Sequence, residues 1–184
     1  MAYDTKRLEK ELEQTKKWFT EELATLRTGR ATPALVDSVS LEVYGTRMKL
    51  NQVASIAVEG PRSLYVTPYD VTHIKAIEKA VTVADLGVSV GSDERGVRVS
   101  FPELTAERRA QLVKLLKGKL EDARIAVKQK RTEEVASLEK AAKAGEATED
   151  DVYIGKADIQ KTIDAANKAL EEVAEKKERE LMEG

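Results

Sequence analysis

Apolar positions recur at steps of three and four residues near both ends of the chain, which is the spacing of one face of an α-helix. A helix with one narrow apolar stripe is unstable alone in water, so three such helices are expected to pack together as a long antiparallel bundle. The three helices are expected to pack as in a coiled coil, and each is expected to contain roughly 35–40 residues. The stripes are Leu8, Leu12, Thr15, Phe19, Leu23 and Leu26; Leu112, Leu116, Leu120, Ala123, Val127, Val135 and Leu138; and Ile159, Ile163, Ala166, Leu170 and Val173.

The middle of the chain has a different pattern. All four prolines lie between residues 31 and 103, and this segment holds 16 charged residues against 48 in the flanks. Proline blocks a continuous helix, while runs rich in Val, Ile and Thr favour strands. The sequence therefore predicts an α+β protein in which a small β/α/β sandwich domain, residues 31–103, is inserted into a helical domain made of residues 1–30 and 104–184.

Six short runs within the insert predict strands: VSLEV, TRMKL, VASIAVE, SLYVTP, VSV and VRVSF. Tyr44 and Gly45 separate the first two runs, as the turn of a hairpin would. Between the fourth and fifth runs a helix is expected from Asp70, its N-cap, to Leu86, with Gly87 ending it.

Two other segments predict helix ends. In LRTGRATPALVD, residues 26–37, Gly29 is expected to end the first helix, with Arg27 in its last turn, where a cation complements the helix dipole. Pro33 would prevent the helix from resuming. A capping box over residues 148–151 predicts the start of the third helix, after a turn at Gly145.

Charge and composition narrow the classes of protein. The net charge is −2 although 35% of residues are charged, so any contact with a nucleic acid must come from local clustering of cations. There is no cysteine, which excludes disulfides and thiolate metal sites. The first thirty residues lack the apolar stretch of a secretory signal, and no run is long enough for a membrane span. We expect a cytoplasmic protein without membrane contact.

The residues also argue against catalysis. His73 is the only histidine and is expected to be a partly buried helix residue, so no multi-histidine metal or catalytic site is predicted. Gly87, Gly91 and Gly96 occur without a phosphate-loop motif and are expected in turns. Most carboxylates are interleaved with lysines, as on a solvated helix face, and those at 149–151 suit the start of a helix. We predict no catalytic residue, no metal and no cofactor, and hence no enzyme.

One group of cations lies on a single face of the predicted second helix: Lys117, Arg124, Lys128 and Arg131, at steps of seven, four and three residues. The apolar stripe lapses around them, because KQKRTEE, residues 128–134, contains no apolar residue. Two interpretations remain open. The segment is either a solvated or frayed turn, or a patch whose guanidinium groups bind the phosphates of a nucleic acid.

Several motifs resemble bacterial ribosome recycling factors. They are RTGRATP (27–33), residues 35–46 ending in YGT, PELTAERR (102–109), RIAVKQKR (124–131) and KERELM (177–182). The resemblance extends from near the first residue to near the last, in the same order. It implies an L-shaped protein in which a small β/α/β domain interrupts a three-helix bundle after the first helix, in agreement with the architecture that the patterns predict.

The resemblance also implies a function. A ribosome recycling factor occupies the large ribosomal subunit after termination and, with elongation factor G and GTP hydrolysis, helps split the ribosome, without itself changing a bond. The residues that match rRNA-binding positions of that family are Arg27, Arg30 and Arg131, and we expect Arg124 and Lys128 to join them. Lys128 stands where arginine is common, so the charge is kept but the fork of donors is not. We expect a monomer that binds rRNA and elongation factor G.

Two linkers would join the domains and form a hinge. The expected hinge residues are Arg30, Ala31, Thr32 and Pro33 in the first linker, and Ser100, Phe101, Pro102, Glu103 and Leu104 in the second. Two adjacent connections permit bending and restrain twisting. The alternative is a helical interaction or scaffold protein without ribosome-splitting activity, whose basic residues are only solvated.

Overall fold

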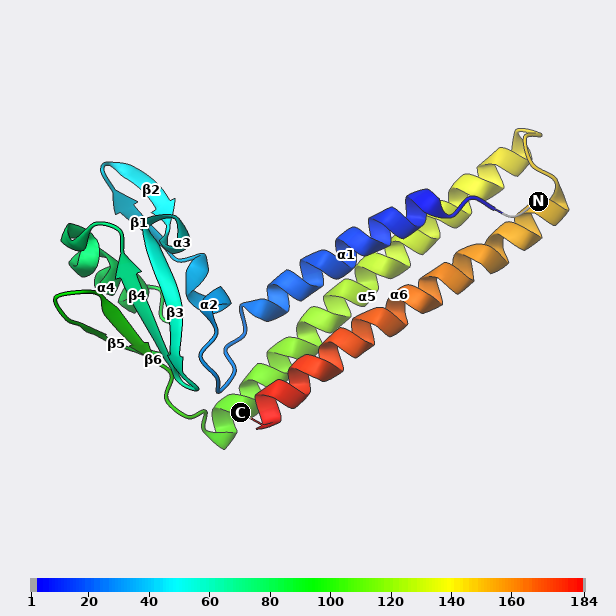
Figure 1. The fold of residues 1–184 in the computed structure, drawn as a ribbon. Helices are drawn as coiled ribbons and strands as arrows, with labels where there is room; N and C mark the ends of the chain where they lie inside the picture. The colour runs from blue at the N-terminus through cyan, green and yellow to red at the C-terminus, as the bar shows by residue number, and fades with distance from the viewer. Residues whose placement is uncertain (1–2, 184) are drawn as a thin grey trace. The chain divides into compact units, whose positions relative to one another are not determined.

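The computed structural model describes residues 3–183. It is an α+β structure whose three long helices and small sheets follow the predicted order (Figure 1). The elements are α1 (Lys6–Ala24), α2 (Pro33–Asp37), β1 (Ser40–Val43), β2 (Thr46–Lys49), α3 (Leu50–Val53), β3 (Ala54–Gly60), β4 (Ser63–Pro68), the 3-10 turn η1 (Val71–His73), α4 (Ile74–Val83), β5 (Ser89–Ser92), β6 (Val97–Ser100), α5 (Ala106–Lys143) and α6 (Glu149–Glu183).

The chain divides into two compact units. The first contains the residues up to Leu23 together with Lys114–Glu178, and the second contains Ala24–Val113 together with the residues from Arg179 onward. The cuts fall inside α5 and α6, so the first turns of α5 and the last turn of α6 count with the second unit. The domain boundaries predicted from the sequence, at residues 30 and 103, stay a prediction.

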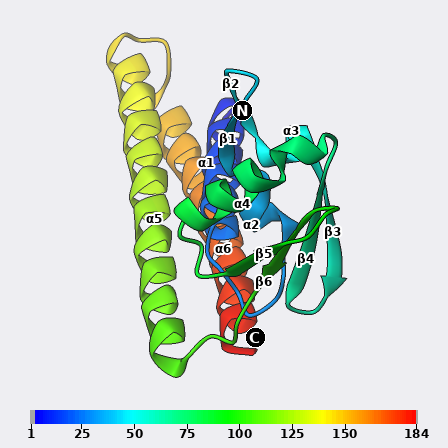
Figure 2. The same cartoon turned by 90° about the vertical axis from the view of Figure 1, so that its left-hand side faces the viewer.

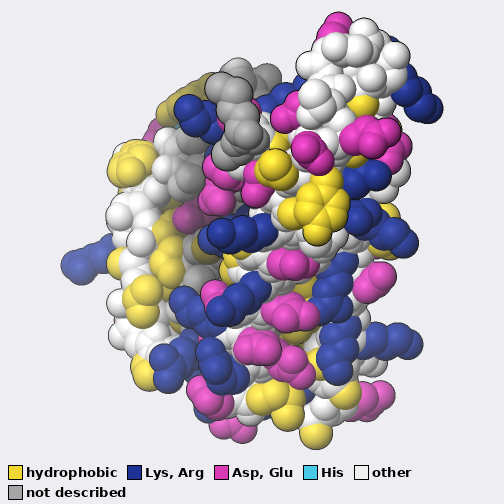
Figure 3. Space-filling model, turned by 90° about the vertical axis from the view of Figure 1, so that its right-hand side faces the viewer, with side chains coloured by type: hydrophobic (Ala, Val, Ile, Leu, Met, Phe, Trp, Pro, Cys, Tyr) yellow, Lys and Arg dark blue, Asp and Glu magenta, His cyan; other side chains and the backbone are white. Residues whose placement is uncertain are grey.

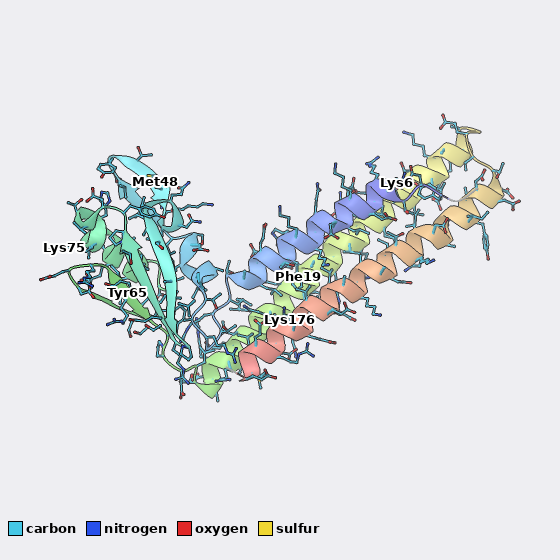
Figure 4. The ribbon with its side chains drawn as sticks, in the orientation of Figure 1. Lys6, Phe19, Met48, Tyr65, Lys75 and Lys176 are labelled. Carbon is cyan, nitrogen blue, oxygen red and sulfur yellow. The ribbon has the colours of Figure 1, made fainter. Side chains whose placement is uncertain are left out.

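The first unit is the three-helix bundle. Its ribbon shows α5 running antiparallel to α1 and α6 (Figure 1). Of the predicted stripes, Leu8, Leu12, Phe19 and Leu23 are buried on α1, and Leu116, Ala123, Val127 and Leu138 on α5. On α6 the buried members are Ile159, Ile163 and Leu170. Figure 4 marks Phe19 on the length of α1 that lies beside the other two helices. The three-helix bundle that the apolar spacing predicted is confirmed.

The length of the first helix was predicted wrongly. α5 and α6, with 38 and 35 residues, have the expected length, but α1 has 19 and ends at Ala24. Gly29 therefore does not end this helix, and Arg27 lies beyond it instead of in its last turn. Beyond the end of α1, the side chain of Arg27 donates to the carbonyl of Pro102 in the second linker.

The seven-residue polar segment of α5 is helical, so it is not frayed. Its side chains reach both neighbouring helices. Lys130 Nζ lies 3.4 Å from Glu11 of α1, and the hydroxyl of Tyr3 donates to Glu134 at 2.6 Å. Arg131 donates to Gln160 of α6 at 2.7 Å. These six residues, Tyr3, Glu11, Lys130, Arg131, Glu134 and Gln160, form a polar layer that replaces the apolar seam over this stretch.

The connection between α5 and α6 follows the predicted signals. Gly145 has φ +78°, its N–H donates to Ala142 O at 3.0 Å, and the next N–H donates to Ala141 O at 2.9 Å. This pair of hydrogen bonds ends α5 as a Schellman motif. At the start of α6, Thr148 N–H donates to Asp151 at 2.9 Å, and Asp151 N–H donates back to Thr148 Oγ1 at 3.1 Å, which confirms the capping box.

The insert lies in the second unit and closes around one apolar core. The sheet order is β3-β4-β6-β5, all antiparallel, and β1 pairs with β2 in a separate hairpin. Helix α4 packs against β5 and β6, and Figure 2 shows it in front of the sheet. Alternate strand residues point inward, as in β4, where Leu64, Val66 and Pro68 are buried. The inserted sheet-and-helix sandwich is therefore confirmed.

Some of the turns and helix ends that the sequence predicted in the insert are confirmed, and others are not. Tyr44 and Gly45 have φ of +52° and +73°, as a two-residue hairpin turn of the primed type requires. Asp70 is the predicted N-cap, because its carboxylate accepts from Thr72 N–H at 2.9 Å. The helix ends at Val83 and not at Leu86, and it opens with the 3-10 turn that contains the partly buried His73. The short helices α2 and α3 were not predicted.

Candidate RNA-binding surface and linkers

The charged surface of the molecule is mixed. On the face that Figure 3 shows, lysine and arginine side chains alternate with aspartate and glutamate, and apolar side chains gather in a few places between them. An exposed cation beside a carboxylate has much of its field compensated. The cations available to an anionic partner are therefore those that lack a carboxylate partner, and the contacts of each one decide its place in a binding surface.

Arg131 is exposed and makes its contact with a neutral group. Its Nε donates to Oε1 of Gln160 at 2.7 Å, and Nε2 of Gln160 donates to Oδ1 of Asp164 at 2.8 Å. No other hydrogen bond or ion pair to Arg131 occurs between residues 3 and 183. Both terminal nitrogens of the guanidinium group are thus available to a phosphate, which binds arginine through two parallel hydrogen bonds.

Arg124 is on the same face of α5 but has a charged partner. Its Nη2 forms an ion pair with Glu171 of α6, and both side chains are about half exposed. A phosphate would have to compete with this carboxylate for the guanidinium group. The structure therefore shows that Arg124 and Arg131, which the sequence spacing could not distinguish, have different kinds of partner.

Two lysines of this segment of α5 also differ in whether they have a carboxylate partner. Lys128 is exposed, and its side chain makes no hydrogen bond or ion pair in the described part of the chain. Lys130, two residues further along and about half a turn around the helix, lies within 3.4 Å of both Glu11 and Glu133. These carboxylates, Glu133 first, raise the pKa of Lys130 above its ordinary value. Of Arg124, Lys128, Lys130 and Arg131, the two without a carboxylate partner among the described residues are Lys128 and Arg131, which form an open cationic pair.

Arg27, another predicted RNA-binding residue, belongs to the second unit and is directed toward the second linker. Its Nη2 donates to the carbonyl of Pro102, and its Cζ lies 5.8 Å from the ring centroid of Phe101, a cation–π distance. Its Nε is buried without a hydrogen-bond partner among residues 3–183. Burial, with a smaller contribution from Arg108, lowers the pKa of Arg27. In this position Arg27 links the first linker to the second.

Arg30 has a different environment, although only two residues separate it from Arg27. It is exposed, and its side chain has no hydrogen bond or ion pair within the described residues. Its carbonyl accepts a long hydrogen bond, 3.4 Å, from the hydroxyl of Thr32. Of the two arginines in RTGRATP, Arg30 is the one presented to solvent.

The two predicted linkers meet on the turn between β3 and β4. Ala31 N–H donates to Pro61 O at 2.9 Å, and Phe101 N–H donates to Arg62 O at 2.7 Å. The ring of Phe101 belongs to the core of the insert and is 2% exposed. Two of the nine predicted hinge residues are therefore anchored to the insert by backbone hydrogen bonds.

Apart from Arg30, the remaining predicted hinge residues fall into two groups. Thr32 is the N-cap of α2, Pro33 is its first residue, and Ser100 is the last residue of β6. Pro102, Glu103 and Leu104 lie between β6 and α5, where Glu103 forms an ion pair with Arg62 at 2.5 Å and Leu104 is buried. The first group belongs to regular elements of the insert, and the second is irregular backbone.

Four residues take part in this surface or these linkers although sequence reasoning did not select them. Gln160 accepts from Arg131, Glu171 forms an ion pair with Arg124, and Arg62 forms an ion pair with Glu103. Arg109 donates to the carbonyls of Leu181 and Met182 at 3.1 and 2.8 Å, near the end of α6. The antiparallel register of α5 and α6 could have paired Arg124 with Glu171, but single side-chain contacts across helices leave no periodic signal.

Two negative findings concern the described residues. No group of three or more His, Asp or Glu side chains there is arranged to hold a metal ion. None of the helices in that part of the chain combines the length and the apolar character that a membrane span needs.

Known proteins resemble the chain over nearly its full length. The family model of ribosome recycling factor matches residues 19–182. The ribosome-recycling factor of Bacillus licheniformis is 45% identical over 165 residues, which cover 90% of this chain and 89% of the relative. That of Rubrobacter xylanophilus is 43% identical over 162 residues, covering 88% and 87%.

Solved structures of ribosome recycling factors also match the fold of this chain. A solution structure of a ribosome recycling factor has a TM-score of 0.76 and 31% identity, and covers 96% of this chain and 94% of its own. A second match has a TM-score of 0.65 and 36% identity, and covers 94% of this chain and 93% of its own. It comes from models of the T. thermophilus ribosome recycling factor and the E. coli elongation factor G bound to the E. coli post-termination complex. With its helices, insert and motifs matched together, this chain belongs to the ribosome recycling factor family.

Proposed function

We propose that this protein binds the post-termination ribosome and, with elongation factor G and GTP, promotes its dissociation into subunits. Membership of the family supports the proposal, as does the neighbouring structure in which a relative and elongation factor G are bound to a post-termination complex. The protein acts mechanically and catalyses no bond change. Its place of action is the cytoplasm, where bacterial ribosomes are, and it works as a monomer.

The open cationic pair of α5 carries the proposal. Lys128 and Arg131 lie three residues apart, are exposed, and lack carboxylate partners in the described structure. Such a pair can neutralise adjacent phosphates of large-subunit rRNA and release their counterions. Arg30 adds an exposed cation near the linkers. Arg124 binds rRNA once a phosphate replaces Glu171 as its partner. Arg27 binds rRNA once it has released the carbonyl of Pro102.

We propose that the two linkers form a hinge between residues 31–103 and the bundle. Bending is concentrated at Arg30 and at residues 102–104, because Ala31, Pro33, Ser100 and Phe101 are tied to elements of the insert. Elongation factor G then moves the insert as one body while the bundle holds the rRNA. The contact of Arg27 with Pro102 couples the two linkers before the protein binds rRNA.

Sedimentation of post-termination ribosomes tests the proposed function. Addition of the protein with elongation factor G and GTP is expected to convert the ribosome peak into subunit peaks, whereas either factor alone, or GDP in place of GTP, is not. A ribosome peak that survives the complete mixture contradicts ribosome splitting. Binding without splitting would favour the alternative of an interaction protein.

A cross-link between the linkers tests the hinge. The chain has no cysteine, so cysteines introduced at Thr28 and Glu103 form a unique pair for a short bismaleimide. The cross-linked protein is expected to bind large subunits normally and to split ribosomes more slowly. The matched control is the same variant with each thiol blocked separately by N-ethylmaleimide. Undiminished splitting after complete cross-linking removes the hinge from the mechanism.

A further inference from the structure

We propose that Gln160 is a positioning residue, which holds the guanidinium group of Arg131 ready for an RNA phosphate without compensating its charge. The inference rests on the proposed function, since the phosphate belongs to the rRNA that the bundle would bind. Gln160 itself needs no contact with RNA. It acts from α6, through the 2.7 Å hydrogen bond from Arg131 Nε, on a side chain of α5.

The register of the two helices shows what Gln160 prevents. Arg124 pairs with Glu171, and Lys156 of α6 lies 2.5 Å from Glu139 of α5. Seven residues after Arg124 is Arg131, and seven before Glu171 is Asp164, so the same antiparallel register sets Arg131 opposite a carboxylate. The observed contact avoids this pairing. Gln160 accepts from Arg131 and donates at 2.8 Å to Asp164, and thereby stands between the cation and the anion.

The chemistry of the three groups explains the effect. A guanidinium group has five N–H donors, and the one on Nε is used by Gln160. The other four, on the two terminal nitrogens, remain for a phosphate. Asp164 orients the amide, because its carboxylate can only accept and so fixes the NH₂ of Gln160 toward itself and the carbonyl toward Arg131. Arg131 is thus restrained before binding and loses less conformational freedom when a phosphate arrives.

Arg124 supplies an internal comparison. It is also an arginine of α5 held by a side chain of α6, but its partner is the carboxylate of Glu171. A charged partner restrains the guanidinium group and also competes with phosphate for it. The neutral partner of Arg131 restrains without competing. The two sites differ in one functional group, carboxylate against carboxamide, and that group can be exchanged by mutation.

A double-mutant cycle tests the inference. The dissociation constant for isolated large subunits is measured at several salt concentrations for wild type, Gln160→Met, Arg131→Met and the double variant. Gln160→Met keeps the length and charge of the side chain and is expected to weaken binding about three- to tenfold, with no further loss in the Arg131→Met background. The matched control, Gln129→Met, removes an exposed glutamine whose amide donates to Glu133 and is expected to bind as wild type does.

Exchanging the functional groups sharpens the test. Gln160→Glu gives Arg131 a carboxylate partner and is expected to weaken binding more than Gln160→Met, with a smaller dependence on salt. Glu171→Gln gives Arg124 the neutral partner that Arg131 has, and is expected to strengthen binding. Equal losses for Gln160→Met with and without Arg131, or unchanged binding of both Gln160 variants, overturn the inference.

A measurement on the free protein separates the two proposals. Hydrogen exchange of the Arg131 Nε–H, followed by NMR, is expected to be slower in wild type than in Gln160→Met. Equal exchange rates overturn the positioning contact even if ribosomes are bound. Failure of the wild-type protein to bind large subunits overturns the proposed function, and the role of Gln160 toward RNA with it, whatever the exchange rates show.

Discussion

The bundle and the insert place their polar contacts differently. In the insert, polar contacts such as that of Arg98 with Glu59 lie among exposed side chains, and the apolar core is uninterrupted. In the bundle, the polar layer is made of exposed or half-buried side chains that bridge neighbouring helices, over the stretch of α5 between Val127 and Leu138. A lapse in apolar periodicity therefore marks the place where helices are joined by directional contacts and where cations are left open to solvent.

The largest expected effect is the loss of a core side chain in either region. Leu116→Ala in the bundle and Leu64→Ala in the insert remove side chains that are 1% and 0% exposed. Each is expected to cost about 2–5 kcal/mol in the free energy of unfolding, from lost burial and the cavity left behind. Val135→Ala, which truncates a half-buried side chain beside the polar layer, is expected to cost less than about 1.5 kcal/mol.

Separate probes keep the two regions apart in this experiment. Trp18 is the only tryptophan and lies on α1, so its fluorescence reports urea unfolding of the bundle. Amide exchange of β4 reports on the insert. If the units unfold independently, Leu116→Ala shifts the fluorescence transition and Leu64→Ala does not. A shift of both probes by both variants would show one cooperative unit and would break the contrast between the regions.

The next effect concerns binding instead of stability. Arg131→Ala is expected to weaken large-subunit binding by about 1–3 kcal/mol, because a charge-assisted contact is lost, while the free energy of unfolding changes by less than about 0.5 kcal/mol. Arg124→Ala, whose guanidinium group already has Glu171, is expected to lose less binding. Binding isotherms at moderate salt measure both. Equal affinities of wild type and Arg131→Ala would remove Arg131 from the surface.

The sequence predicted the arrangement of the helices and the insert well because periodicity is a local property. The stripes of α5 and α6, the turn at Tyr44 and Gly45 and the capping box at Thr148 each follow from a few neighbouring residues. The end of α1 was missed because the helix stops at Ala24, where neither a glycine nor a proline marks it in the sequence. Gly29 and Pro33 were valid local signals, but the chain had already left the helix.

The candidate site shows the same limit. Spacing along α5 placed Arg124, Lys128 and Arg131 on one face, and exposure agrees with that placement. The spacing could not show which cations have partners, because Glu171 and Gln160 are distant in the sequence. Nothing in a single sequence distinguishes these two residues from the many other polar residues of α6. Whether a cation is open or paired is a tertiary property.

A pair of glycines tests how closely the bundle is packed beside the polar layer. Gly118 of α5 has no atom near the position of an added Cβ, whereas a Cβ on Gly155 of α6 would lie 2.5 Å from Leu138 Cδ2. Gly118→Ala is expected to stabilise the bundle by about 0.5–1 kcal/mol through helix propensity. Gly155→Ala is expected to gain less or to destabilise, since the buried Leu138 must shift. If both variants were equally stabilised against urea, Leu138 would move away from the added Cβ at little cost in free energy.

The smallest expected effects depend on pH and have opposite signs in the two regions. Burial, and then the hydrogen bond to Glu134, raises the pKa of Tyr3 in the bundle to about 12. In the insert, hydrogen bonds from Tyr44 and then Thr72 lower the pKa of Asp70 to about 2. Both pairs contain a tyrosine that donates to a carboxylate at 2.6 Å. The pKa of Tyr44 is raised as well, by its hydrogen bond to Asp70, and the pKa of Asp70 is lowered because it accepts from several donors.

The directions follow from linkage between protonation and folding. The contribution of Tyr3 is present below its unfolded pKa of about 10 and is lost as the pH rises toward 12. The contribution of Asp70 is present above its unfolded pKa of about 3.9 and is lost as the pH falls toward 2. Tyr3→Phe should therefore remove part of the alkaline loss seen by Trp18 fluorescence, and Asp70→Asn part of the acid loss seen in the insert. Tyr44→Phe, which keeps the ring beside His73, removes the main donor to Asp70 and should reduce the acid loss. The same hydrogen bond raises the pKa of Tyr44, so this variant should also remove a part of the alkaline loss. If Tyr3→Phe altered only the acid limb, or Asp70→Asn only the alkaline one, the assignment of these two contacts to opposite ends of the pH range would be wrong.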